Sequence, residues 1–66
     1  MKTMNTIRKH RERAGWTQVQ LAERAGIAWR TVQDLERGVS APTLASMRGI
    51  CKALDMPPEI IWPEDD

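Results

Sequence analysis

One short segment of this sequence, residues 29–37, carries side chains that could recognise base pairs. Helical spacing places its long hydrogen-bonding residues on one face, and a tryptophan adds a large apolar ring: Trp29, Arg30, Gln33, Asp34 and Arg37. An α-helix fits the major groove of DNA, where arginine can bind guanine and glutamine can bind adenine. An ordinary solvent-exposed helix carries similar residues, so this face by itself leaves both interpretations open.

The sequence before this segment predicts the arrangement that would hold it free on the surface. A helix is expected to begin at Thr17, which forms a capping box with Gln20, and to end at Gly26, which favours left-handed backbone. A second helix is expected over about 28–37, ended by a glycine. Small and apolar side chains fill the angle between the two: Leu21, Ala22, Ala25, Ile27, Val32 and Leu35. A tight glycine-containing turn between two helices predicts a helix-turn-helix unit over about 17–38.

Three more helices are predicted around this unit, and no segment alternates in the manner of a strand. They are expected over about 5–14, 44–54 and 58–62. On the second of these, Gly49 lies mid-helix and costs about 1 kcal/mol relative to alanine. The apolar stripe of that helix is expected to be Leu44, Met47, Ile50, Cys51 and Leu54.

The length and the charge of the chain restrict its possible domain organisation and partners. A chain of 66 residues is expected to be one domain, 1–66, with a marginal core that a second subunit would help to stabilise. Residues 1–37 carry eight basic and four acidic side chains, a net charge of +4, whereas residues 38–66 carry two basic and five acidic ones, a net charge of −3. The basic half favours a polyanionic partner, although an ordinary solvated surface can have the same charges. The acidic tail, 63–66, is expected to lie away from phosphates.

Features of the sequence argue against several classes of protein. No segment reaches the roughly 20 apolar residues of a membrane span, and the N-terminus is too polar for a signal peptide. Cys51 is the only cysteine, so no internal disulfide and no zinc spacing exist. His10 is expected on a polar helix face and Cys51 on a core stripe, which gives no nucleophile pair. We therefore expect a cytoplasmic protein that is not an enzyme and binds no metal or cofactor.

Four motifs extend the pattern over roughly residues 5–62. They are Thr17-Gln18-x-x-Leu21-Ala22-x-x-Ala25-Gly26-Ile27, Val32-x-x-Leu35-Glu36-x-Gly38, Pro42-Thr43-Leu44 and Ile50-Cys51-Lys52-Ala53-Leu54. Together with the flanking helices they resemble the phage-repressor and Cro-like (Xre-type) helix-turn-helix family. The resemblance implies an all-α, five-helix, lambda-repressor-like DNA-binding domain with a central helix-turn-helix. It also implies sequence-specific binding of double-stranded DNA as a dimer.

The resemblance assigns roles to individual positions of this sequence. It implies base readout by Ala28, Trp29, Arg30, Gln33 and Asp34. It implies phosphate contact by Thr17, Gln18, Arg11 and Arg37, and by the backbone of Gly38, Val39 and Ser40. It also pairs Arg11 with Glu36, which would supply a partner for a cation on the inward face of the first helix; the alternative is that both are surface charges.

Two positions and one loop depart from the family pattern. Ala28 replaces the usual serine or threonine and loses a helix cap, and the loop after Gly38 has no lysine or arginine of its own. Trp29 stands where a polar residue is usual. It could press a thymine methyl group, or it could fold over Val32 and the stem of Glu36, and packing is the favoured interpretation.

The C-terminal end carries more apolar side chains than one small core can bury. The resemblance implies a homodimer interface here, formed by Met56, Pro57, Pro58, Ile60 and Trp62. A simple core-capping helix is the alternative, and it accounts for Ile61 at least. Two recognition helices joined in this way would be spaced by one DNA turn, about 34 Å.

The function that follows is transcriptional regulation. The sequence predicts a regulator, expected to be a repressor, that binds a short palindromic operator as a homodimer. The alternative is an antitoxin-like or adaptor module that uses the same fold to bind an unknown protein partner.

Overall fold

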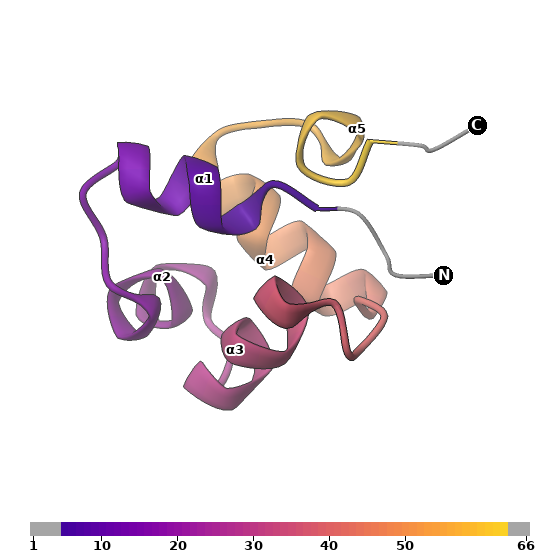
Figure 1. The fold of residues 1–66 in the computed structure, drawn as a ribbon, viewed down its shortest axis with the longest axis horizontal. Helices are drawn as coiled ribbons and strands as arrows, with labels where there is room; N and C mark the ends of the chain where they lie inside the picture. The colour runs from indigo at the N-terminus through magenta and orange to yellow at the C-terminus, as the bar shows by residue number, and fades with distance from the viewer. Residues whose placement is uncertain (1–4, 64–66) are drawn as a thin grey trace.

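Five helices with short connections make up the fold in the computed structural model, which describes residues 5–63 (Figure 1). They are α1 (Ile7–Arg13), α2 (Gln18–Ala25), α3 (Trp29–Arg37), α4 (Leu44–Leu54) and α5 (Pro58–Ile61). No strand occurs within residues 5–63. The predicted all-α architecture of five helices is therefore confirmed, whereas the acidic tail beyond Pro63 lies outside the described residues.

One apolar cluster holds the five helices together, and every helix contributes to it. The side chains that it buries completely are Ile7, Leu21, Val32, Leu35, Ile50 and Ile61. Each fully buried aliphatic side chain contributes about 1.5–3 kcal/mol relative to an exposed one. Ile61 thus caps the core, as the sequence indicated.

The first helix is shorter than predicted because the residues before it are used in tertiary contacts. The Asn5 side chain donates to the Leu35 carbonyl at 2.8 Å and accepts from the Ile7 amide at 3.3 Å. The Thr6 amide donates to the Ile61 carbonyl at 2.7 Å. These bonds hold Asn5 and Thr6 outside the helix and fasten the start of α1 to α3 and α5.

The prediction that Leu44 belongs to the apolar stripe of α4 is wrong. Leu44 is the first residue of α4 and is exposed, whereas the buried row consists of Ser46, Ile50 and Leu54 at spacings of four. Ser46 tolerates burial because Thr43 satisfies it: Thr43 Oγ1 accepts from the Ser46 amide at 3.1 Å and donates to Ser46 Oγ at 3.0 Å. The i, i+4 row faces the core, and the helix start lies beyond its edge.

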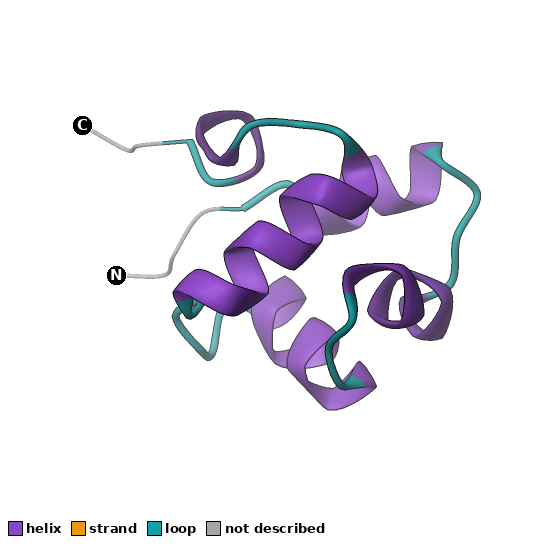
Figure 2. Cartoon of the chain, turned by 180° about the vertical axis from the view of Figure 1, so that it is seen from behind, coloured by secondary structure: helices purple, strands orange, loops and turns teal. Residues whose placement is uncertain are grey.

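Gly49 has a packing role that periodicity alone did not show. It faces α2, where a methyl group on its Cα would overlap the carbonyl oxygen of Ala25. Figure 2 shows α4 crossing in front of α1 and α3. The glycine lowers helix propensity, but it lets α2 and α4 approach more closely than any other residue would allow.

Candidate nucleic-acid interface

The helix-turn-helix is built by local rules that the sequence displays. Thr17 Oγ1 accepts from the Gln20 amide at 3.1 Å, and Gln20 Oε1 accepts from the Thr17 amide at 2.8 Å, which completes the capping box. Gly26 ends α2 in the left-handed region at φ 70°, and the Ile27 amide donates to the Ala22 carbonyl at 3.0 Å. The turn then places α3 across α2 with one long face uncovered.

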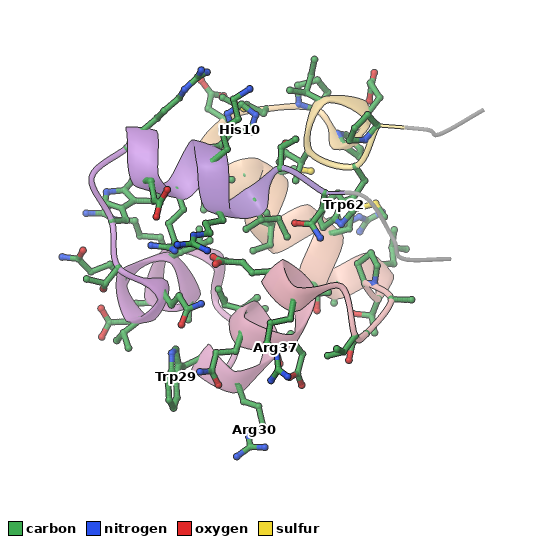
Figure 3. The ribbon with its side chains drawn as sticks, viewed as in Figure 1. His10, Trp29, Arg30, Arg37 and Trp62 are labelled. Carbon is green, nitrogen blue, oxygen red and sulfur yellow. The ribbon has the colours of Figure 1, made fainter. Side chains whose placement is uncertain are left out.

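The uncovered face of α3 presents most of the predicted readout residues. Figure 3 shows Trp29 and Arg30 projecting from the start of α3, away from α1 and α5. Ala28, Trp29 and Arg30 are exposed, and Gln33 and Asp34 are half-buried. Ala28 makes no side-chain cap bond, so the start of α3 keeps backbone N–H groups without an intrahelical partner.

A nearly buried ion pair stands behind this face and joins α1 to the end of α3. Arg11 Nε donates to Glu36 Oε2 at 2.6 Å and Arg11 Nη2 donates to Glu36 Oε1 at 3.2 Å, with side-chain exposures of 11% and 5%. Arg11 Nη1 also donates to the Trp16 carbonyl at 2.7 Å. The hydrogen bond to Glu36 raises the pKa of Arg11 above its ordinary value, although burial opposes this. Arg11 therefore stays charged, and the structure brings it together with Glu36.

Gln18 connects this ion pair to the exposed surface. Its Nε2 donates to Glu36 Oε1 at 3.1 Å, and its Oε1 accepts from Trp29 Nε1 at 3.3 Å. One N–H of the Gln18 amide stays free of these two bonds and can donate to a phosphate. Trp29 is 48% exposed, so about half of the residue remains open to solvent.

A hollow of about 320 Å³ opens beside Gln18 and collects cationic side chains. It is lined by Arg8, Arg11, Gln18, Glu36 and Arg37. Arg8 and Arg37 are exposed, so they can meet a phosphate, whereas most of the Arg11 guanidinium is already used. Arg8 was not among the residues predicted from the sequence, although its position one helical turn before Arg11 was an available signal.

The loop after α3 differs from the prediction. Gly38 takes φ 73° and its amide donates to the Leu35 carbonyl at 3.2 Å, while the Val39 amide donates to the Asp34 carbonyl at 3.1 Å. These bonds cap the helix, so the Gly38 and Val39 amides are not available to a phosphate. The cap leaves the amide and hydroxyl of Ser40, together with the Arg37 side chain, as donors at this end of α3.

The C-terminal end divides between core and surface. Met56 and Trp62 are half-buried and pack against the core, whereas Pro57, Pro58 and Ile60 are exposed. Trp62 also lines a shallow hollow of about 440 Å³ with Met47, Pro58 and Glu59. Three of the five residues predicted for a dimer interface, Pro57, Pro58 and Ile60, therefore leave apolar surface uncovered.

His10 and Cys51 do not form a reactive pair. Contrary to expectation, His10 is half-buried, and its Nδ1 has no hydrogen-bond partner among the described residues. Cys51 packs against the core, where burial first and Glu59 second raise the pKa of its thiol. Within residues 5–63 there is also no group of three or more side chains suited to holding a metal ion, and no helix with the length and apolarity to cross a membrane.

Comparison with known proteins agrees with this geometry. A family model described as helix-turn-helix matches residues 7–61. An uncharacterized HTH-type transcriptional regulator of Bacillus subtilis, YgzD, is 35% identical over 63 residues, which cover 94% of this chain and 96% of that protein. An uncharacterized HTH-type transcriptional regulator of Methanothermobacter thermautotrophicus is 44% identical over 48 residues, 73% of this chain and 70% of that protein.

A third relative is longer than this chain. The HTH-type transcriptional regulator SutR of Escherichia coli is 33% identical over 52 residues, which cover 79% of this chain and 29% of that protein. These relatives indicate DNA binding and transcription regulation, not catalysis, in agreement with the sequence interpretation. The chain belongs to the Xre-type helix-turn-helix family of transcriptional regulators and has its lambda-repressor-like helical fold.

Proposed function

We propose that this protein is a sequence-specific repressor that binds a short palindromic operator in double-stranded DNA as a homodimer. The observation that carries the proposal is the free start of α3. There, Arg30 projects beside Trp29, and exposed Arg8 and Arg37 lie on the flank of the same surface. In helix-turn-helix proteins the N-terminal residues of the second helix contact base edges, while flanking cations hold phosphates.

The homodimer is supported by size and by the apolar C-terminal surface. The molecule measures 31 Å along its longest axis and carries one recognition helix, so one copy can read one half-site. Ile60 is 49% exposed beside Pro57 and Pro58. Two copies that cover these residues against each other would remove apolar surface from water and present two recognition helices on one face.

Repression would follow from occupancy of the operator. A protein of this size that covers a promoter or its start site excludes other proteins from the same DNA surface. To connect the structure to regulation, the operator sequence and the spacing of its half-sites must therefore be determined.

Selection from a pool of random duplexes tests the proposal. At about 50 mM salt, bound DNA should converge on one motif made of two inverted half-sites with centres about 10 base pairs apart. Ile60→Asp is the matched variant: it should lower the sedimentation coefficient to that of a monomer and select single half-sites. Retention of no duplex at this salt would contradict the proposed function and favour a protein partner instead.

A further inference from the structure

Trp29 is an exposed aromatic residue whose indole N–H is hydrogen-bonded within the protein. It is the first residue of α3, about half of its side chain is exposed, and its indole N–H donates to Gln18 Oε1 at 3.3 Å. A tryptophan has one polar atom, and here that atom is already satisfied within the protein. The ring therefore offers only apolar surface to whatever approaches the start of α3.

The orientation of Gln18 follows from the chemistry of its two partners. The indole N–H can only donate, and the Glu36 carboxylate, which is paired with Arg11, can only accept. The Gln18 amide must therefore turn its oxygen to Trp29 and its nitrogen to Glu36. A continuous series of hydrogen bonds runs from the buried Arg11–Glu36 pair through Gln18 to the exposed ring.

The major groove contains one apolar group that distinguishes bases, the methyl group on C5 of thymine. Cytosine lacks this group, but 5-methylcytosine carries it at the same position. Contact with an apolar ring removes the methyl from water and favours binding without any hydrogen bond to the base.

We propose that Trp29, positioned by Gln18, reads the C5 methyl group of one pyrimidine in each half-site. This assignment rests on the proposed function, because it requires the start of α3 to enter the major groove. Gln18 is then a positioning residue for base readout in addition to any phosphate contact of its second N–H. A ring that serves only to cover the Arg11–Glu36 pair from water is the competing explanation.

Base analogues test the contact directly. In the operator selected for the wild-type protein, each thymine is replaced in turn by deoxyuridine, which lacks only the methyl group. Replacement at one position per half-site should weaken binding about fourfold, and 5-methylcytosine at that position should bind better than cytosine. Trp29→Ala should bind thymine and deoxyuridine operators equally, whereas Arg30→Ala should keep the difference.

A double-mutant cycle tests the positioning by Gln18. Gln18→Met has a similar length but makes neither hydrogen bond, so it should reduce the thymine-to-deoxyuridine ratio toward one. Trp29→Phe keeps a ring but has no N–H, so Gln18→Met should cause little further change in the ratio in that background. Thermal unfolding of each variant shows whether it is folded, and the ratio itself does not depend on the amount of active protein.

The outcomes separate this inference from the proposed function. A wild-type protein that selects an operator but shows the same deoxyuridine effect as Trp29→Ala, or none at any position, overturns the methyl contact and leaves DNA binding intact. A ratio that is unchanged in Gln18→Met overturns the positioning role. A wild-type protein that selects no DNA overturns both.

Discussion

The guanidinium of Arg11 lies 2.6 Å from the carboxylate of Glu36, and these two residues, 25 positions apart in the sequence, join α1 to α3. Glu36 also accepts a hydrogen bond from Gln18, and Arg11 donates one to the Trp16 carbonyl. One pair thereby fixes the end of α3, the start of α2 and the connection that precedes it.

Removing one member of the pair should strongly destabilise the fold. Glu36→Gln or Arg11→Met leaves a nearly buried charge without its partner, which costs about 3–5 kcal/mol of unfolding free energy. Urea unfolding monitored by circular dichroism measures the loss. The double variant Arg11→Met/Glu36→Met should recover much of the stability, since no buried charge remains unpaired.

A second ion pair, formed by two residues of α1, provides the control. Arg8 Nε and Glu12 Oε2 are 3.2 Å apart, but their side chains are 73% and 56% exposed. Arg8→Met should change the free energy of unfolding by less than about 0.5 kcal/mol. Equal losses from Arg8→Met and Arg11→Met would contradict the role given to burial.

Gly49→Ala should destabilise the protein, although alanine is the better helix former. The added methyl group would overlap the Ala25 carbonyl oxygen and push α4 away from α2. Intrinsic propensity alone would give a gain of about 1 kcal/mol. The exposed Ala45 near the start of the same helix is the comparison position, where Ala45→Gly should show a loss of up to about 1 kcal/mol. A stabilised Gly49→Ala variant would show that the helices do not cross as closely as described.

Arg30→Ala and Arg37→Ala should affect DNA binding differently. Arg30 projects from the start of α3, where base edges are read, so its loss should cost about 1–3 kcal/mol on the selected operator and relax preference at one base pair. Arg37 lies at the other end of α3 beside the cationic hollow. Its loss should weaken binding to all sequences alike and lower the slope of log affinity against log salt by about one. Salt titrations on operator and random duplexes separate the two effects, and identical behaviour of both variants would refute the division.

Burial of Cys51 should make stability fall in alkaline solution. The pKa of the thiol lies above its ordinary value of 9.0 in the folded state, first because it is desolvated and second because of Glu59. The unfolded chain therefore ionises at lower pH. The contribution to stability is present below about pH 9 and is lost as the pH rises through the folded-state pKa. Urea unfolding of the wild type and Cys51→Ala at pH 7 and pH 10 measures it, and the wild type should lose more stability than the variant does. The same loss in both proteins would show that other groups cause the change.

Local signals in the sequence were sufficient for much of the fold. The capping box of Thr17 and Gln20, the left-handed Gly26 and the apolar spacing of Leu21, Val32 and Leu35 depend on residues close together in the chain, and each is present as predicted. Leu44 was misplaced because periodicity does not show where a helix leaves the edge of the core.

The sequence by itself thus determined five helices, the helix-turn-helix between 17 and 38 and the residue types on the outer face of α3, because caps, turns and helical periods are short-range properties. Tertiary structure decided which partners those residues have. The Gln18 amide lies between Trp29 and Glu36, the Val39 amide is used in a helix cap, and Gly49 lies against Ala25. Each of these depends on where a side chain or a backbone group ends up relative to a neighbouring helix or turn. Close packing between elements determines such positions, and no pattern along one helix contains them.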